Sequence, residues 1–186
     1  LTAEEEQHYM ALIDSSLLAG QAVLEAGGTA TDAVAAAIQI MEDSPLFNAG
    51  KGAVFNHDGI NELDASIMDG KTLDAGAIAA VRHVKNPIQL ALMVMKDSKF
   101  VFLSADGAEN YARSKGIELV DSTYFYTEHR WQQLLEAREE DEMKLDHSES
   151  KKSATIWDKI SKEEKFGTVG CVALRSEEHT SELQSQ

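Results

Sequence analysis

The strongest constraint on the fold is an alanine-rich stretch, GGTATDAVAAAIQIMEDSP, which starts at Gly27. Thr29 and Asp32 have the spacing of a helix capping box and Pro45 stops a helix, so the sequence predicts a helix between them. Two of its faces are apolar, one formed by Ala33, Ala36, Ala37 and Ile40 and the other by Val34, Ile38 and Met41. Because small side chains let backbones approach closely, this helix is expected to pack directly against a sheet or another helix.

A second amphipathic helix is predicted just before this stretch, over residues 3–26. Its apolar stripe has helical spacing and consists of Met10, Ile13, Leu17, Gly20 and Leu24. The pair Gly27-Gly28 supplies the glycine that commonly ends a helix. Two consecutive helices are thus predicted before any strand.

Glycine-punctuated sequence follows the helices and predicts strands. Asp58-Gly59 and Asp69-Gly70 are hairpin-type turn signals. The apolar runs around them, 53–55, 63–68 and 77–81, predict sequential and mostly antiparallel strands. Further along, the sequence predicts a helix after Asn86-Pro87 up to Met95, a strand at 100–103, a short helix at 107–114, a helix at 129–138 and a strand at 169–174. This order of elements predicts a mixed α/β (α+β) fold.

Residues 139–165 are rich in charge, with an unbroken acidic run from Glu139 to Glu142 and then Ser/Lys-rich sequence. A segment of this composition has too few apolar residues to form a core, so it is predicted to be a mobile linker. A linker that leads into an apolar strand is expected where a chain is cut at that junction.

The net charge of the chain limits the classes of partner that it can bind. Its formal net charge of −15 repels nucleic acid and anionic membranes, so neither is expected as a partner. Cys171 is the single cysteine, which excludes an internal disulfide, and it is predicted to face the core. No apolar run reaches the length of about 18 residues that a membrane-spanning helix needs. Since the first residue is Leu1, we expect further sequence upstream, and a cytoplasmic and a periplasmic location both stay open.

Gly167-Thr168, directly before the last predicted strand, is a candidate self-cleavage site with Thr168 as the nucleophile. A threonine hydroxyl needs an adjacent base, and its own free amine can serve once the preceding peptide bond is cut. Gly167 suits such a cut because it accepts a strained backbone and leaves its carbonyl open to the Thr168 hydroxyl. Taken alone, the same pair is more typical of an ordinary strand start.

Other candidate residues have simpler explanations. Asp64 and Asp69 are a candidate carboxylate pair, although a satisfied buried polar group at Asp64 and turn capping at Asp69 are the favoured interpretation. His57 and His83 are predicted to be turn and surface residues. The six histidines form no His-x-x-x-His or Cys-His cluster, so no transition-metal site is predicted.

Four segments together resemble the plant-type (type 2) L-asparaginases, also called isoaspartyl peptidases: GGTATDAVAAAIQIMEDSPLFNAGKGAVFNHDGINELDASIMDG, DAGAIAAVRHVKNPIQLA, GAENYA and FGTVGCVAL. The similarity spans residues 8–174, and these proteins are N-terminal nucleophile (Ntn) hydrolases. The resemblance implies an αββα sandwich, incomplete in this chain, and a precursor that cuts itself into an α subunit, 1–167, and a β subunit that starts at Thr168. Thr168 is then the nucleophile that hydrolyses the asparagine amide and the isopeptide bond of β-aspartyl dipeptides. The related glycosylasparaginases carry Asp-Thr at the cut, so Gly167 favours the isoaspartyl peptidase branch, with a glycosylasparaginase-type amidase as the alternative.

The resemblance also implies an ion site and partners. Backbone carbonyls in one loop would hold a structural sodium ion, at Met41, Glu42, Ser44, Phe47, Ala49 and Lys51, and no other cofactor is implied. Asn48 in the same loop is implied to help hold the region around Thr168, with a plain turn residue as the alternative. The implied partners are a small-molecule or dipeptide substrate and the protein's own β subunit, in a dimer of αβ units.

The chain departs from the family pattern at both ends. Members begin with a strand ending in His-Gly-Gly-Ala-Gly, and after the GTVG strand they continue to an Arg and an Asp that bind the substrate. From Arg175 this chain reads RSEEHTSELQSQ, which resembles the in-frame translation of a common DNA-sequencing adapter, so residues 175–186 are predicted to be a non-native tail. Only 168–174 then represent the β subunit, and we expect this polypeptide to be inactive. An alternative of a different class is a non-catalytic acidic interaction domain.

Overall fold

The computed structural model describes residues 2–146, 168–175 and 181–185. Helices and strands are mixed in one α+β fold, as predicted. The helices are α1 (Ala3–Glu25), α2 (Ala30–Glu42), α3 (Pro87–Asp97), α4 (Ala105–Lys115) and α5 (Glu128–Asp146), with 3-10 turns η1 (Gly50–Gly52) and η2 (Ser122–Phe125). The strands are β1 (Leu63–Met68), β2 (Ala75–Val81), β3 (Phe102–Ser104), β4 (Val169–Ala173) and β5 (Ser181–Ser185).

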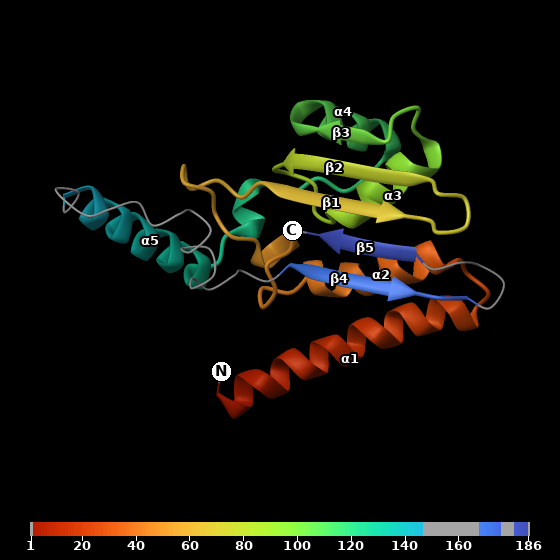
Figure 1. The fold of residues 1–186 in the computed structure, drawn as a ribbon, viewed down its shortest axis with the longest axis horizontal. Helices are drawn as coiled ribbons and strands as arrows, with labels where there is room; N and C mark the ends of the chain where they lie inside the picture. Colours follow the sequence, from red (N-terminus) through yellow and green to blue (C-terminus); the bar gives the residue numbers. More distant parts are fainter. Residues whose placement is uncertain (1, 147–167, 176–180, 186) are drawn as a thin grey trace, which may run out of the picture.

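The strands of the described residues form one sheet in the order β3-β2-β1-β5-β4 (Figure 1). β1 and β2 make an antiparallel hairpin across Asp69-Gly70, as the turn signal predicted. β3 pairs parallel with β2, and β5 pairs antiparallel with both β1 and β4. β5 falls within 175–186, so part of the predicted non-native tail lies between β1 and β4, and the foreign origin of that tail stays a prediction.

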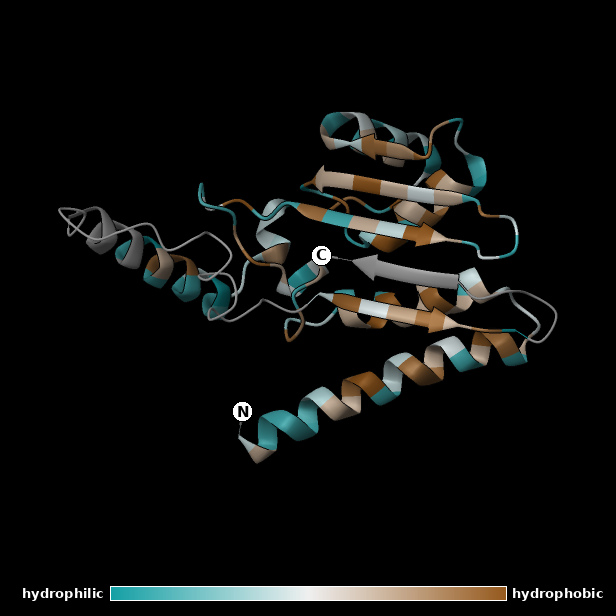
Figure 2. Cartoon of the chain, in the orientation of Figure 1, coloured by the Kyte–Doolittle hydropathy of each residue, from teal (hydrophilic) through white to brown (hydrophobic). Residues whose placement is uncertain are grey.

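Helices cover one face of the sheet. α2 contacts β4 and β5 while α3 contacts β1 and β2, and Figure 1 shows both helices behind the strands. Along β1, Leu63, Ala65 and Ile67 are buried in the core that the sheet shares with these helices. Ser66 and Met68, which alternate with them, are exposed on the opposite face. Figure 2 shows the apolar residues of α2 and α3 lying behind the sheet.

α1 packs along α2 through small residues. A Cβ added at Gly20 would lie 3.1 Å from the Ala33 carbonyl oxygen and 3.5 Å from the Ala37 Cβ. In the same contact, the Ser16 hydroxyl donates a 2.8 Å hydrogen bond to the Ala37 carbonyl oxygen. The close approach predicted from the alanine-rich face is therefore confirmed, with α1 as the partner.

The apolar stripe predicted along α1 is wrong for most of its length. Met10, Ile13 and Leu17 have 53%, 37% and 60% of their surface exposed, whereas Gly20 is buried and Leu24 is half-buried. A contact made through glycine and serine brings the two helix backbones close together, which leaves the longer side chains beside the contact rather than inside it. Leu17 and Leu24 line a groove of about 450 Å³ between α1, α2 and β4.

The strand predicted at 53–55 does not form. Asn48 Oδ1 accepts a 3.0 Å hydrogen bond from the Val54 amide. Asn61 Nδ2 donates to the carbonyl oxygens of Ala53 and Val54, at 2.9 and 3.2 Å. Because these side chains bind the backbone groups that a strand would offer to a neighbour, the segment has no regular secondary structure.

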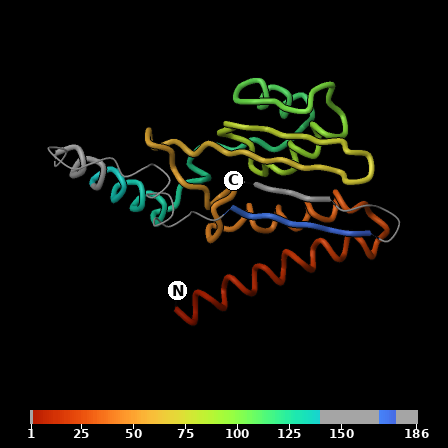
Figure 3. The backbone as a smooth tube through the Cα atoms, in the orientation of Figure 1, coloured from red at the N-terminus to blue at the C-terminus, as the bar shows by residue number. Residues whose placement is uncertain are grey.

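α5 continues beyond its predicted end at Arg138 and reaches Asp146. It takes up the first residues of the predicted linker because Glu, Met, Lys and Leu, which are good helix formers, predominate there. The rest of that linker, 147–165, lies outside the described residues. Figure 3 shows α5 projecting away from the sheet. None of the helices in the described part of the chain is long and apolar enough to cross a membrane.

Candidate functional site

Thr168 lies directly before β4 and is half-buried. Gly167, on the other side of the predicted cut, lies outside the described residues. Figure 1 shows the start of β4 at the same end of the sheet as the loop that follows α2. α2 contacts β4, the strand that follows Thr168, and the loop that contains Asn48 begins where α2 ends.

β4 determines the direction in which Thr168 faces. Val169 is buried in the core and Cys171 packs against it, whereas Gly170 and Val172 are exposed. Strand alternation, continued one residue upstream, places Thr168 with Gly170 and Val172, on the face that the helices do not cover. The position of Cys171 confirms its predicted contact with the core, and burial raises the pKa of its thiol.

The predicted sodium ligands lie at the end of α2, in the loop that follows it and in η1. The Met41 carbonyl accepts a hydrogen bond from the Ser44 amide at 3.2 Å, and the Ala49 carbonyl accepts one from the Gly52 amide at 3.0 Å. A carbonyl oxygen has two lone pairs, so these bonds are compatible with a cation on the same oxygens.

Two glycines let this loop fold onto its own carbonyls. A Cβ at Gly50, whose φ is 49°, would lie 2.3 Å from the Glu42 carbonyl oxygen. A Cβ at Gly52 would lie 2.0 and 2.7 Å from the carbonyl oxygens of Phe47 and Pro45. A larger residue would therefore fill the space beside these oxygens. Backbone carbonyl dipoles are the donors that coordinate alkali cations, so the loop fits sodium in its donor chemistry.

Asn48 acts within its own loop. Its Oδ1 holds the Val54 amide, six residues further along the chain. This contact agrees with the alternative interpretation of Asn48 as a turn residue, and it holds the last residues of the loop in place. A supporting role of Asn48 for Thr168 stays a prediction.

The side chain of Glu42 is a structural feature that the sequence patterns did not indicate. It is fully buried, and its Oε1 accepts a 3.0 Å hydrogen bond from the Ile88 amide in the first turn of α3. Asn86 occupies the N-cap position as predicted, but its Nδ2 donates to Asp43 at 3.0 Å. A carboxylate at a helix N-terminus satisfies a free amide and complements the helix dipole. No local pattern reveals a partner 46 residues away.

The carboxylates of Asp64 and Asp69 bind backbone amides. Asp64 Oδ1 accepts from Ala80 at 2.7 Å, and Asp69 Oδ1 accepts from Lys71 at 2.8 Å. These contacts agree with a satisfied polar group at Asp64, which is half-buried rather than buried, and with turn capping at Asp69. In the described part of the chain, no group of three or more His, Cys, Asp or Glu side chains could hold a metal ion.

His83 and Glu109 form a pair at the end of β2. His83 Nδ1 lies 3.0 Å from Glu109 Oε2, and Glu109 Oε1 accepts the amides of Arg82 and His83 at 2.8 and 3.0 Å. Burial by itself would raise the pKa of Glu109, but these hydrogen bonds outweigh it and hold the pKa below its usual value. The charged carboxylate thus fastens α4 to the chain after β2.

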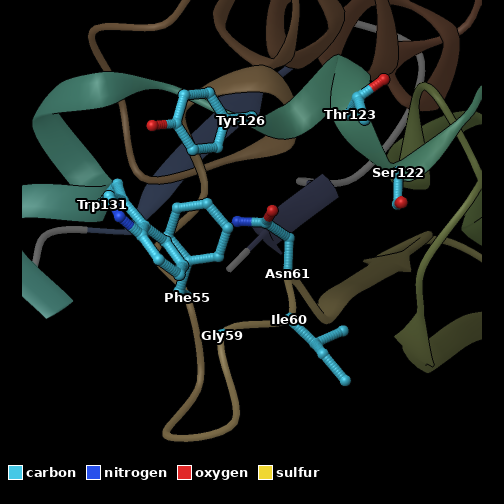
Figure 4. Close-up of a pocket in the computed structure, with 8 residues that line it drawn as sticks. All are labelled: Phe55, Gly59, Ile60, Asn61, Ser122, Thr123, Tyr126 and Trp131. Carbon is cyan, nitrogen blue, oxygen red and sulfur yellow. The ribbon is translucent and has the colours of Figure 1, made fainter.

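An aromatic pocket of about 450 Å³ lies between α5, η2 and the segment after η1 (Figure 4). It is lined by Phe55, Gly59, Ile60, Asn61, Ser122, Thr123, Tyr126 and Trp131. The Phe55 ring meets Tyr126 and Trp131 edge-on, with centroids 6.0 and 5.2 Å apart. None of the lining residues is charged, so the pocket does not suit the charged groups of an aspartyl ligand.

Comparison with known proteins identifies the class. A family model described as asparaginase matches residues 1–182. The chain is 43% identical over 174 residues to an isoaspartyl peptidase of Escherichia coli (strain K12), covering 94% of this chain and 52% of that protein. It is 44% identical over 173 residues to an isoaspartyl peptidase of Salmonella typhimurium (strain LT2), covering 93% and 53%. It is 37% identical over 180 residues to an isoaspartyl peptidase/L-asparaginase of Xenopus laevis, covering 95% and 52%.

The chain therefore belongs to the asparaginase family that includes the isoaspartyl peptidases, which are Ntn hydrolases. It spans about half the length of these curated relatives. The family resemblance inferred from the sequence motifs is confirmed.

Proposed function

We propose that this chain is part of a threonine-nucleophile amidohydrolase that hydrolyses β-aspartyl isopeptide bonds and the side-chain amide of asparagine. The observation that carries the proposal is 43–44% identity to two isoaspartyl peptidases over 93–94% of the chain. The position of Thr168, half-buried at the start of β4, supports its assignment as the nucleophile.

The first step of the proposed chemistry is self-cleavage. Thr168 Oγ1 attacks the Gly167 carbonyl carbon, the peptide C–N bond breaks, and the hydroxyl proton passes to the new amine. Water then hydrolyses the resulting ester. The products are a carboxylate at Gly167 and a free N-terminal Thr168.

The second step is substrate hydrolysis by the freed residue. The Thr168 amine takes the hydroxyl proton while Oγ1 attacks the side-chain carbonyl of the aspartyl group. The leaving amine receives that proton, and an ester to Thr168 remains. Water hydrolyses the ester, which releases aspartate and restores the nucleophile. Preorganised hydrogen-bond donors for the developing oxyanion are needed, as in acyl transfer generally.

The architecture of the active protein is proposed to be an αββα sandwich. The described part contains one layer of helices on one sheet, and Ser66 and Met68 leave the other sheet face exposed. An exposed sheet face is where a second sheet packs in a sandwich. The β subunit would supply that layer, and two αβ units would form the dimer.

A structural sodium ion is proposed for the loop at 41–52. When bound, it would stiffen the loop that contains Asn48 by linking carbonyls from both of its ends. Its proposed ligands are the backbone oxygens of Met41, Glu42, Ser44, Phe47, Ala49 and Lys51, and the close approach of Gly50 and Gly52 to carbonyl oxygens supports this assignment.

The proposal is tested with the gene read past codon 174 from uncontaminated genomic DNA and expressed as the longer protein. We expect two polypeptides, a new N-terminus at Thr168, and release of aspartate from a β-aspartyl dipeptide. Thr168→Ala should abolish both cleavage and hydrolysis. Thr72→Ala, in the exposed turn after β1, is the matched control and should change neither.

Two outcomes would contradict the proposal. One is full hydrolysis by Thr168→Ala, and the other is a natural stop at codon 175, which would favour a non-catalytic acidic domain. Faster release from a glycosylated asparagine than from the dipeptide would support the glycosylasparaginase-type alternative. The 186-residue chain itself should yield neither the new N-terminus nor aspartate.

A further inference from the structure

The loop at 41–54 is held by side chains from α1, from α5 and from the segment before β1. Tyr9 of α1 donates its hydroxyl to the Leu46 carbonyl oxygen at 2.9 Å. Arg130 of α5 donates Nε to the Gly52 carbonyl oxygen at 2.8 Å. Asn61, before β1, donates to the next two carbonyls along the chain, at 2.9 and 3.2 Å.

The carbonyls bound in this way are not those proposed for the ion. Side chains bind the oxygens at positions 46, 52, 53 and 54, whereas the proposed ligands are at 41, 42, 44, 47, 49 and 51. The two sets of carbonyls have no member in common. Tyr9 of α1 contacts the loop a second time, because its ring packs edge-on against Phe47, with ring centroids 5.4 Å apart.

Arg130 is the most unusual member of the group. Its residue is only 9% exposed, and burial lowers the pKa of its guanidinium. Arginine is rarely buried without a carboxylate partner. Within the described residues, Arg130 forms no salt bridge, and its guanidinium donates to the Gly52 carbonyl and to Gln133 Oε1 at 2.9 Å.

We propose that Arg130 is a positioning residue that, together with Tyr9 and Asn61, clamps the loop at 41–54 in one conformation through carbonyls other than those proposed as cation ligands. The identity of the cation rests on the proposed function, but the clamp rests on the contacts alone. A charged donor binds a neutral carbonyl more strongly than a neutral donor does, which accounts for an arginine at this buried place.

The geometry also explains why lysine cannot replace this arginine. The planar guanidinium reaches Gly52 through Nε and Gln133 through Nη1 at the same time. A lysine ammonium is a single point on a flexible stem and cannot hold both acceptors in that arrangement. Arg130→Lys should therefore retain the charge and lose most of the clamp.

The test is amide hydrogen exchange on the 186-residue chain, with Arg130→Gln, Arg130→Lys and Tyr9→Phe. The reporting amides are those of Gly52, Ala53 and Val54, which bond within the loop. We expect their exchange to rise about tenfold or more in Arg130→Gln and to rise less in Arg130→Lys, while the β1–β2 amides stay unchanged. Tyr9→Phe removes one hydroxyl and keeps the ring, so it should raise exchange near Leu46 even if Arg130→Gln fails to fold.

The matched control is Arg138→Gln. Arg138 also lies on α5 and also donates to a backbone carbonyl, that of His57, but it is only half-buried and its acceptor lies outside the loop. Its replacement should leave exchange at 52–54 unchanged. A second arm compares melting temperatures in sodium chloride and in choline chloride at equal ionic strength, where sodium should stabilise the wild type more than Arg130→Gln.

The two arms separate the two proposals. Faster loop exchange in Arg130→Gln without any sodium response of the wild type would support the clamp and contradict the sodium site. Unchanged loop exchange in folded Arg130→Gln and in Tyr9→Phe would overturn the clamp, whatever the sodium response.

Discussion

At the scale of single residues, Glu109 carries a charge on a side chain that is largely shielded from water. Two backbone amides and the His83 ring stabilise its ionised form, so the pKa of Glu109 is lower in the folded chain than in the unfolded chain. A carboxyl group with a lowered folded-state pKa contributes stability above its unfolded pKa, and this contribution is lost as the pH falls through the folded pKa.

We expect Glu109→Gln to reduce the free energy of unfolding at neutral pH by about 1–2 kcal/mol, because a neutral acceptor binds amides less strongly than a charged one. The difference from the wild type should shrink as the pH falls below about 4.5, the usual value for this group. Urea unfolding at a series of pH values between about 6 and 3 measures it. A difference that stays constant over this range would show that the charge of Glu109 does not stabilise the fold.

At the scale of elements, the contact between α1 and α2 depends on the absence of side-chain volume. Gly20 lies against the backbone of Ala33 and the side chain of Ala37, and the Ser16 hydroxyl bonds across the same contact. The helices approach closely because neither carries a bulky residue there. The apolar side chains of α1 contribute less, since Leu17 remains 60% exposed.

We expect Gly20→Val to destabilise the chain by about 1–3 kcal/mol, because the new side chain would force the helices apart. Gly107→Val is the matched control, since a Cβ at Gly107 of α4 meets nothing within 4 Å. The control should change stability by less than about 0.5 kcal/mol, as exposed substitutions usually do. Urea unfolding of both variants provides the comparison, and equal losses would contradict the proposed role of the close contact.

At the scale of the whole molecule, the described part consists of one sheet covered on one face. Ile67 of β1 is 2% exposed and faces the core, whereas its neighbour Met68 is 41% exposed on the other face. If the proposed sandwich is right, the longer protein buries that second face under another sheet. Met68 would then be exposed in the 186-residue chain and buried in the longer protein.

We therefore expect Met68→Lys to change the stability of the 186-residue chain by less than about 0.5 kcal/mol and to impair folding and activity of the longer protein. Ile67→Lys should destabilise both proteins, because it buries a charge in the core that is already present. Thr72→Lys in the exposed turn should affect neither. Full activity of the longer Met68→Lys protein would contradict the sandwich.

Much of the fold could be predicted from local patterns. Several features have a sequence signal within a few residues of the feature itself. They are the alanine-rich α2, the β1–β2 hairpin at Asp69-Gly70, the start of α3 at Asn86-Pro87, and the end of α4 at Gly116, whose backbone is in the left-handed conformation. The family was also evident from motifs, because PLFNAG, ELDASIMDG, KNPI and GTVG are specific in combination. These motifs also singled out Thr168 as the candidate nucleophile.

The sequence by itself determined most of the helices and strands, their order and the family, because capping residues, turn glycines and periodic apolar residues act over short range. Only the tertiary structure decided which face of each helix or strand packs against a neighbour. It turned Gly20 toward α2 and left Leu17 exposed, it replaced the strand at 53–55 by bonds to Asn48 and Asn61, and it brought Glu42 to α3. Arg130 reaches Gly52 across 78 residues. Contacts of this range depend on how whole elements pack, and no window of sequence contains both partners.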